Sequence, residues 1–185
     1  MSVELHLATP AELDATTLYR VLQLRVEVFV VEQQCPYPEL DGRDLEPGTR
    51  WLWATEAPEA AKAEAAERAQ PAESTEAADS AGTVLATLRI LREPSGTARI
   101  GRVATARRAR GAGLAADLVR YALRVLDEDP TEIVLDAQTP LAGWYRRFGF
   151  EPAGAQFVED GISHLPMRRP PVAEGSGRPA GRTAR

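Results

Sequence analysis

The chain has 185 residues, 44% of them hydrophobic, and a formal net charge of −5, which predicts one globular domain with room for an ordinary core. The acidic balance argues against a general nucleic-acid-binding surface, so no nucleic-acid partner is expected. A single cysteine excludes an internal disulfide and a cysteine-based metal cage, and the absence of a long apolar run or a signal-peptide pattern predicts a cytoplasmic protein without membrane contact.

The first predicted elements are a strand and a helix. Residues 3–7 alternate like a half-buried strand. Thr9 and Glu12 match the N-cap and N3 positions of a capping box, so a helix is expected to begin there and to carry an apolar stripe as far as Phe29. Arg25 lies on that stripe, where both a buried ion pair and a contact to an anionic substrate group stay open.

Residues 30–50 show no periodicity and are rich in proline, glycine and acid, which predicts a loop. Its carboxylates include Glu32, Glu39 and Asp41, and each alone is interpreted most simply as a solvated loop residue. Cys35 is flanked by prolines and is expected to be a packed thiol. A second strand is expected at 51–55.

Residues 56–81 consist almost wholly of Ala, Glu, Pro, Ser and Thr, with seven acidic against two basic side chains. Such a segment lacks the large apolar residues that offset ordering entropy, so we predict a disordered insertion between the second strand and a third at 82–93. Residues 170–185 are predicted to be a disordered tail, which leaves 1–169 as the folded domain.

A strand at 98–105 leads through an arginine-rich loop with two glycines into a helix whose apolar face begins at Leu114. Glycines allow close backbone approach, and a helix start offers unpaired N–H groups, which together predict a phosphate site. A P-loop is excluded because the only lysine is the distant Lys62. A dinucleotide fingerprint stays open as the second alternative, since residues 111–116 match G-x-G-x-x-A and Asp136 follows at a suitable distance.

The remaining elements are a strand at 131–136, a short helix at 141–148 closed by Gly149, and a terminal hairpin of 153–158 with 162–167. The strand has consecutive apolar residues, which is typical of a strand covered on both faces.

Several motifs occur together in the order of one enzyme family. Arg110, Gly113 and Ala115 match R-x-x-G-x-G/A, and WYRRFGF at 144–150 carries a Tyr just ahead of Gly-Phe. With the stretches at 24–53 and 99–105, the LDAQ at 135–138 and the EDGISHLPM at 159–167, the chain resembles the GNAT N-acetyltransferases and specifically their ElaA-like subfamily. The resemblance spans Val3 to about Arg169.

This resemblance implies an α/β (α+β) GNAT fold, with a single mixed central sheet of about six or seven strands and about four flanking helices. The sheet is expected to splay between its fourth and fifth strands. The implied reaction is direct transfer of an acetyl group from acetyl-CoA, in a ternary complex, to an amine of a small molecule or peptide. No metal is expected, and both monomer and homodimer stay open.

The resemblance also assigns roles to residues. Tyr145 corresponds to the tyrosine that protonates the CoA thiolate, and the segment after the first helix borders the acceptor cleft, which places Glu39 and Asp41 there. Arg25, on the stripe of the first helix, is a further candidate for contact with the substrate. The general base stays open, with Glu32, Glu39, Asp41 and His164 as candidates. The donor is expected to contact the backbone or side chains of Val103, Ala104, Thr105, Arg110, Gly111, Ala112, Gly113, Leu114 and Ala115.

Two other functions stay open beside the acetyltransferase. One is an NAD(P)-binding oxidoreductase with a Rossmann-like unit, and the other is a CoA-binding module that has lost catalysis.

Overall fold

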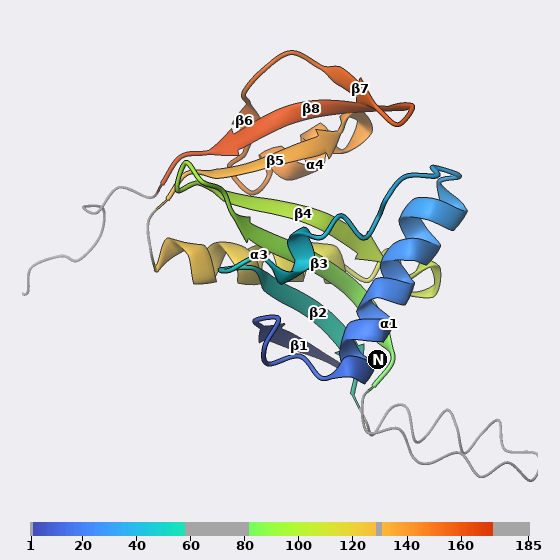
Figure 1. The fold of residues 1–185 in the computed structure, drawn as a ribbon. Helices are drawn as coiled ribbons and strands as arrows, with labels where there is room; N and C mark the ends of the chain where they lie inside the picture. The colour runs from blue at the N-terminus through green and yellow to red at the C-terminus, as the bar shows by residue number, and fades with distance from the viewer. Residues whose placement is uncertain (1, 58–81, 129–130, 172–185) are drawn as a thin grey trace, which may run out of the picture.

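The computed structural model of the chain describes residues 2–57, 82–128 and 131–171 (Figure 1). The predicted insertion and tail, apart from the first two residues of each, lie outside the described residues. The expectation that they are disordered therefore stays a prediction.

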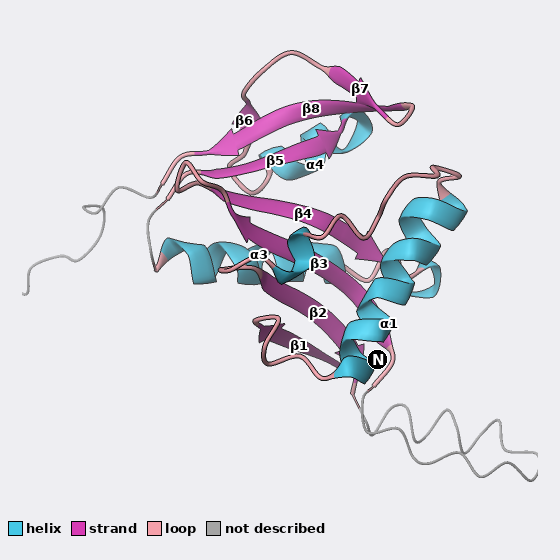
Figure 2. Cartoon of the chain, in the orientation of Figure 1, coloured by secondary structure: helices cyan, strands magenta, loops and turns pink. Residues whose placement is uncertain are grey.

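An eight-stranded sheet organises the described part of the chain, in the order β1-β2-β3-β4-β5-β8-β6, with β7 paired to β8 (Figure 2). Every pairing is antiparallel except that of β4 with β5. A doubly wound dinucleotide fold needs a mostly parallel sheet, so the Rossmann-like alternative is wrong. The strands are β1 (Val3–Ala8), β2 (Arg50–Glu56), β3 (Val84–Arg92), β4 (Ala98–Thr105), β5 (Ile133–Gln138), β6 (Glu151–Pro152), β7 (Phe157–Glu159) and β8 (Ile162–Arg169).

Three α-helices lie within the described ranges: α1 (Ala15–Arg25), α3 (Leu114–Asp127) and α4 (Ala142–Arg146). Alternating residues of β2 show that α1 and α3 cover opposite faces of the sheet. Trp51 and Trp53 pack in the core under α1, while Leu52 and Ala54 pack in the core under α3. The mixed sheet between helical layers confirms the predicted fold (Figure 1).

The first helix begins later than its sequence predicts. Thr9 and Glu12 do make the expected contact, with the Thr9 N–H 2.8 Å from Glu12 Oε2, but they close only a turn. Asp14 is the N-cap instead, because its carboxylate accepts from both the N–H and the hydroxyl of Thr17, at 2.9 and 2.6 Å. From Val26 to Glu32 the helix widens into a π-helix, a local form frequent at functional sites.

The sheet splits between β4 and β5, as expected. These strands pair only through Ala98 with Ile133 and Arg99 with Val134, and then diverge (Figure 1). The edge of β4 that faces β5 is therefore left without a strand partner from Ile100 onward. A register shift against β3 accompanies Arg102, whose φ of +53° is a strained value for a residue other than glycine.

Candidate active site

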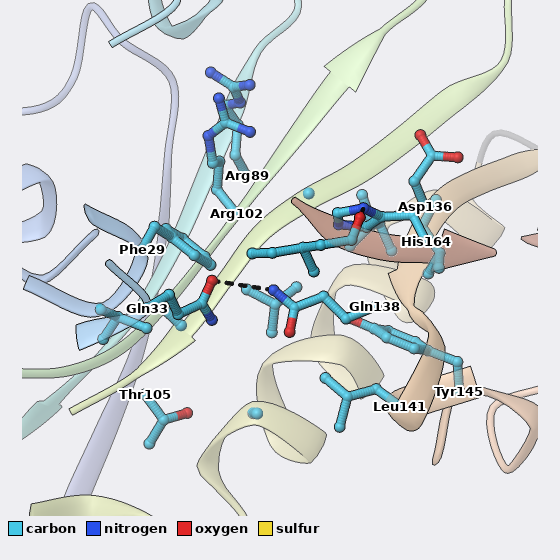
Figure 3. A pocket seen from close by; sticks show the side chains of 18 of the residues that line it. Phe29, Gln33, Arg89, Arg102, Thr105, Asp136, Gln138, Leu141, Tyr145 and His164 are labelled. Atoms are coloured by element: carbon cyan, nitrogen blue, oxygen red, sulfur yellow. Dashed lines mark hydrogen bonds between the residues drawn. The ribbon is translucent and has the colours of Figure 1, made fainter. Parts of the chain in front are cut away.

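A cleft of about 1240 Å³ occupies the opening between β4 and β5 (Figure 3). One wall comes from β4, the loop after it and the start of α3. The other comes from β5, α4 and the β7–β8 hairpin, and the π-helix and the loop that follows it cover the end of the cleft lined by Tyr37 and Arg102. The splay thus creates space into which three distant parts of the chain direct side chains.

The loop before α3 offers backbone N–H groups to this cleft. Gly111 and Gly113 have φ values of +81° and +87°, which favour glycine, and a Cβ at either would meet no protein atom within 4 Å. Gly113 is the N-cap of α3 and supplies no side-chain cap. The first N–H groups of α3 therefore stay open toward the cleft at the positive end of the helix dipole, an arrangement suited to phosphate.

Arg110 lies in the same loop and is held by a carboxylate. Its Nη1 and Nη2 donate to the two carboxylate oxygens of Glu32 at 2.6 and 2.8 Å, and its Nε donates to the Thr105 carbonyl at 3.1 Å. The hydrogen bond and charge of Arg110 outweigh partial burial and lower the pKa of Glu32. Glu32 and Arg110 are both about 40% exposed, so an anionic ligand has access to this pair.

Tyr145 enters the cleft from α4. Its side chain is 7% exposed and packs edge-on against Trp144 and Phe150, with ring centroids 4.8 and 5.9 Å away. Burial raises the pKa of Tyr145 to about 12, so its phenol stays protonated at neutral pH. Within the described residues the contacts of Tyr145 are ring contacts with Trp144 and Phe150, so its hydroxyl is available to donate to a ligand in the cleft.

His164 lies across the cleft on β8, opposite Gln138 of β5 in the strand register. Its Nδ1 lies 3.0 Å from the Ile162 carbonyl, and its ring stacks on Phe157 with centroids 5.6 Å apart. Because a carbonyl only accepts, Nδ1 carries the proton in this contact, and the lone pair of the neutral ring is on Nε2.

A buried ion-pair cluster supports the end of the cleft lined by Tyr37 and Arg102. Arg25 is 0% exposed and donates to Glu39 through Nε and to Asp44 through Nη1, the latter at 2.8 Å. Arg89 donates to Asp44 Oδ1 at 2.7 Å. The full set of six, which we call the charge cluster, has three cations and three anions: Arg25, Arg89, Arg102, Glu39, Asp41 and Asp44.

Three members of the charge cluster, Asp41, Arg89 and Arg102, reach the cleft. Burial by itself would raise the pKa of Asp41. Hydrogen bonds and charge from Arg89, with smaller contributions from Arg43 and Arg102, outweigh the effect of burial and lower the pKa to about 2. Arg102 also stacks over the ring of Tyr37, 5.4 Å from its centroid. Burial, and then the hydrogen bond to Glu39, raise the pKa of Tyr37.

The structure brings most of the predicted site residues to one cleft. Arg25 and Glu39 are not in the lining, because each is buried against the other and against further cluster members. Ala112 is also outside it and is exposed. The predicted residues in the lining are Glu32, Asp41, Val103, Ala104, Thr105, Arg110, Gly111, Gly113, Leu114, Ala115, Tyr145 and His164.

Other lining residues were not singled out from the sequence. Gln138 Nε2 donates to Gln33 Oε1 at 3.1 Å across the cleft (Figure 3), and Tyr37 and Arg102 line one end of it. The sequence suggests Asp136 only as the ribose ligand of the dinucleotide alternative. In the structure its carboxylate accepts a hydrogen bond from Arg99 Nη1 at 2.6 Å. The alternation of Asp136 and Gln138 on one face of β5 is the signal that places both in the cleft.

Neither a metal centre nor a membrane span is found in the described part of the chain. No group of three or more His, Cys, Asp or Glu side chains there is arranged to hold a metal ion. No helix in those ranges is long and apolar enough to cross a membrane.

Several known proteins are similar to this chain in sequence. A family model described as "Acetyltransferase (GNAT) domain" matches residues 48–170. A UPF0039 protein of Mycobacterium tuberculosis is 43% identical over 162 residues, which are 86% of this chain and 88% of the relative. Protein ElaA of Escherichia coli is 31% identical over 165 residues, 86% of this chain and 91% of ElaA.

Two solved structures are similar to this chain in both fold and sequence. An acyl-CoA N-acyltransferase from Pseudomonas aeruginosa superimposes with a TM-score of 0.74 and 37% identity, covering 91% of this chain and 99% of that one. Escherichia coli ElaA superimposes with a TM-score of 0.73 and 29% identity over the same shares of the two chains.

Proposed function

The chain belongs to the GNAT acetyltransferase family as a relative of ElaA, and on that premise we propose that it transfers an acetyl group from acetyl-CoA to an amine of a small molecule or peptide. One observation carries the proposal. The cleft at the splay joins the open N–H groups of the Gly113-capped helix to the hydroxyl of Tyr145. A phosphate-bearing thioester laid along β4 would place its sulfur toward that hydroxyl.

The donor is assigned to the β4 side of the cleft. The N–H groups at the start of α3, with Arg110, bind the pyrophosphate, and the unpaired edge of β4 at Val103 to Thr105 pairs with the amides of the pantetheine arm. This places the acetyl group at the splay, between Tyr145 and the end of the cleft lined by Tyr37, Asp41 and Arg102. We assign that end to the acceptor and call it the acceptor end.

The acceptor must lose a proton before it attacks. An alkyl ammonium with a pKa near 10.4 costs about 4.6 kcal/mol to neutralise at pH 7. Of the four candidate bases, Glu32, Glu39 and Asp41 are each paired with arginine, which weakens a carboxylate as a base. His164 keeps a free lone pair on Nε2, and we assign the base role to it.

The transfer then follows without a covalent enzyme intermediate. His164 Nε2 takes one proton of the ammonium before the attack. The neutral amine nitrogen then forms a bond to the thioester carbonyl carbon and releases its second proton to water. The carbon–sulfur bond breaks, and the departing thiolate takes the proton of the Tyr145 hydroxyl. Solvent restores both side chains. With the phenol pKa raised to about 12, the acid stays in its active form at neutral and mildly alkaline pH.

The first experiment compares ligands. Acetyl-CoA, NADH and NADPH are added separately, and the rise in unfolding temperature is followed, since a ligand at about 100 times its Kd stabilises by about 2.7 kcal/mol. Stabilisation by acetyl-CoA is expected. Stabilisation by NADH without any response to acetyl-CoA would contradict the proposal.

The second experiment separates the enzyme from an inert CoA-binding module. CoA thiol release is followed across an amine panel for the wild type, Tyr145→Phe and His164→Gln. Each variant should lose roughly 100-fold or more in kcat with little change in acetyl-CoA affinity. Tyr121→Phe on α3, whose ring stacks with Arg124, is the matched control. Acetyl-CoA binding with no thiol release for any amine would favour the inert module.

A further inference from the structure

The segment Glu32–Cys35, which we call the bridging segment, contacts both arms of the splay. Glu32 holds Arg110, in the loop after β4, through two hydrogen bonds of 2.6 and 2.8 Å. Gln33 accepts from Gln138 at the end of β5 at 3.1 Å (Figure 3). Cys35 Sγ lies 3.3 Å from the carbonyl of Asp160, in the β7–β8 turn. Four consecutive residues thus tie together parts of the cleft that are separate in the chain.

These contacts hold the bridging segment unequally. The Glu32–Arg110 contact is bidentate and charge-assisted, the strongest type of the three. The Gln33 contact joins two neutral amides, and a thiol is a weak donor. Between them Gln34 has a φ of +53°, a strained value for glutamine. Loss of the Glu32 contact therefore removes the strongest of the three side-chain contacts that hold the segment across the cleft.

The donor and Glu32 compete for one guanidinium. A pyrophosphate bound at the start of α3 needs Arg110, whose Nη atoms are occupied by the Glu32 carboxylate. The carboxylate would also repel the phosphates. Donor binding at this site therefore separates Glu32 from Arg110.

We propose that the Glu32–Arg110 ion pair closes the bridging segment over the cleft, and that donor binding releases the segment and opens the acceptor end. This inference rests on the proposed function, because it takes a CoA pyrophosphate as the competing anion. Release also breaks the Gln33–Gln138 contact. This contact crosses the cleft, with Thr105 and Tyr145 on its donor side and Arg102 on its acceptor side (Figure 3). The acceptor then binds after the donor.

Cys35 reports the position of the segment. It is the only cysteine of the chain and is 5% exposed. Burial, and then the charge of Asp160, raise the pKa of its thiol, so it should react slowly with iodoacetamide while the segment is closed. Intact mass measures this alkylation, and S-methyl-CoA serves as the donor probe because it has no free thiol and no acyl group to transfer.

The expected results form a matched set. S-methyl-CoA should accelerate alkylation of the wild type about tenfold, within the range ordinary for coupled sites. Glu32→Gln should react fast without ligand and bind S-methyl-CoA about tenfold more tightly by calorimetry. Glu27→Gln should behave like the wild type, because Glu27 is exposed on the same π-helix and its charge acts on Arg110 without any hydrogen bond to it.

Several outcomes would overturn the inference. One is an alkylation rate that saturating ligand leaves unchanged, and another is an equal response of Glu27→Gln and Glu32→Gln, which would reduce the effect to general charge. Unchanged tryptophan fluorescence separates opening of the segment from unfolding. If neither the wild type nor either variant bound S-methyl-CoA, the donor assignment and the coupling would both be wrong. Fast alkylation of Glu32→Gln without ligand would then still show that Glu32 holds the bridging segment.

Discussion

The two ends of the cleft are built in different ways. The end that we assign to the donor is built mainly of backbone: the glycine turn, the open N–H groups of α3 and the free edge of β4, with Arg110 beside them. The acceptor end rests on side-chain charge, in a cluster whose members come from α1, the following loop, β3 and β4. A backbone site needs only a local conformation, whereas a charge cluster needs its partners brought together by the whole fold.

The largest expected effect is at the acceptor end. Arg25→Ala would leave Glu39 and Asp44 buried with fewer cations, which should lower the free energy of unfolding by about 3–5 kcal/mol. Urea denaturation measures it. Arg25→Lys keeps the charge but not the planar fork, and should recover part of the loss. A loss below about 1 kcal/mol for the alanine variant would mean that the cluster is not a structural support.

A smaller loss is expected at the donor end, from Gly113→Val. The left-handed conformation at a φ of +87° should cost about 1–2 kcal/mol of stability, and the new side chain should fill space open to the ligand. Gly96→Val is the matched control, since Gly96 has the same φ of +87° in the β3–β4 turn outside the cleft lining. Acetyl-CoA titration should show weaker binding for the Gly113 variant alone. Equal binding by the two variants would contradict a backbone donor site.

The acceptor end should also respond to acid. The pKa of Asp41 is lowered from 3.8 to about 2 in the folded protein, so the unfolded state takes up the proton first as pH falls. The stabilisation is complete above pH 3.8 and is lost as pH falls through about 2. Urea midpoints over this range should fall more steeply for the wild type than for Asp41→Asn. If the urea midpoints of the wild type and Asp41→Asn fell equally steeply with pH, Asp41 would not contribute to the acid sensitivity.

The smallest effect is expected for an exposed pair outside the cleft. Glu151 and Arg168 are joined at 3.3 Å with more than half of the Glu151 side chain exposed. Glu151→Gln should change the free energy of unfolding by no more than about 0.5 kcal/mol. A loss as large as that of Arg25→Ala would show that burial does not explain the difference between ion pairs in this protein.

Some features of the fold follow from short stretches of sequence. The strand–loop–helix around residues 98–126 is predictable because alternation, glycines and a helical apolar face are all local. The same holds for the Gly149 that ends the turn after α4, with a φ of +85°. The start of α1 is not predictable in this way, because Thr9 and Asp14 both offer a local cap and only packing of the helix against the sheet selects Asp14.

The sequence by itself therefore determined the family, the element order and the glycine-rich loop before α3, because each depends on residues close together in the chain. The tertiary structure alone decided which acids are neutralised and which side chains meet across the cleft. Glu32 and Arg110 are 78 residues apart, Gln33 and Gln138 are 105 apart, and Cys35 and Asp160 are 125 apart. No local pattern encodes such contacts, because the splayed sheet must form before these side chains come within reach.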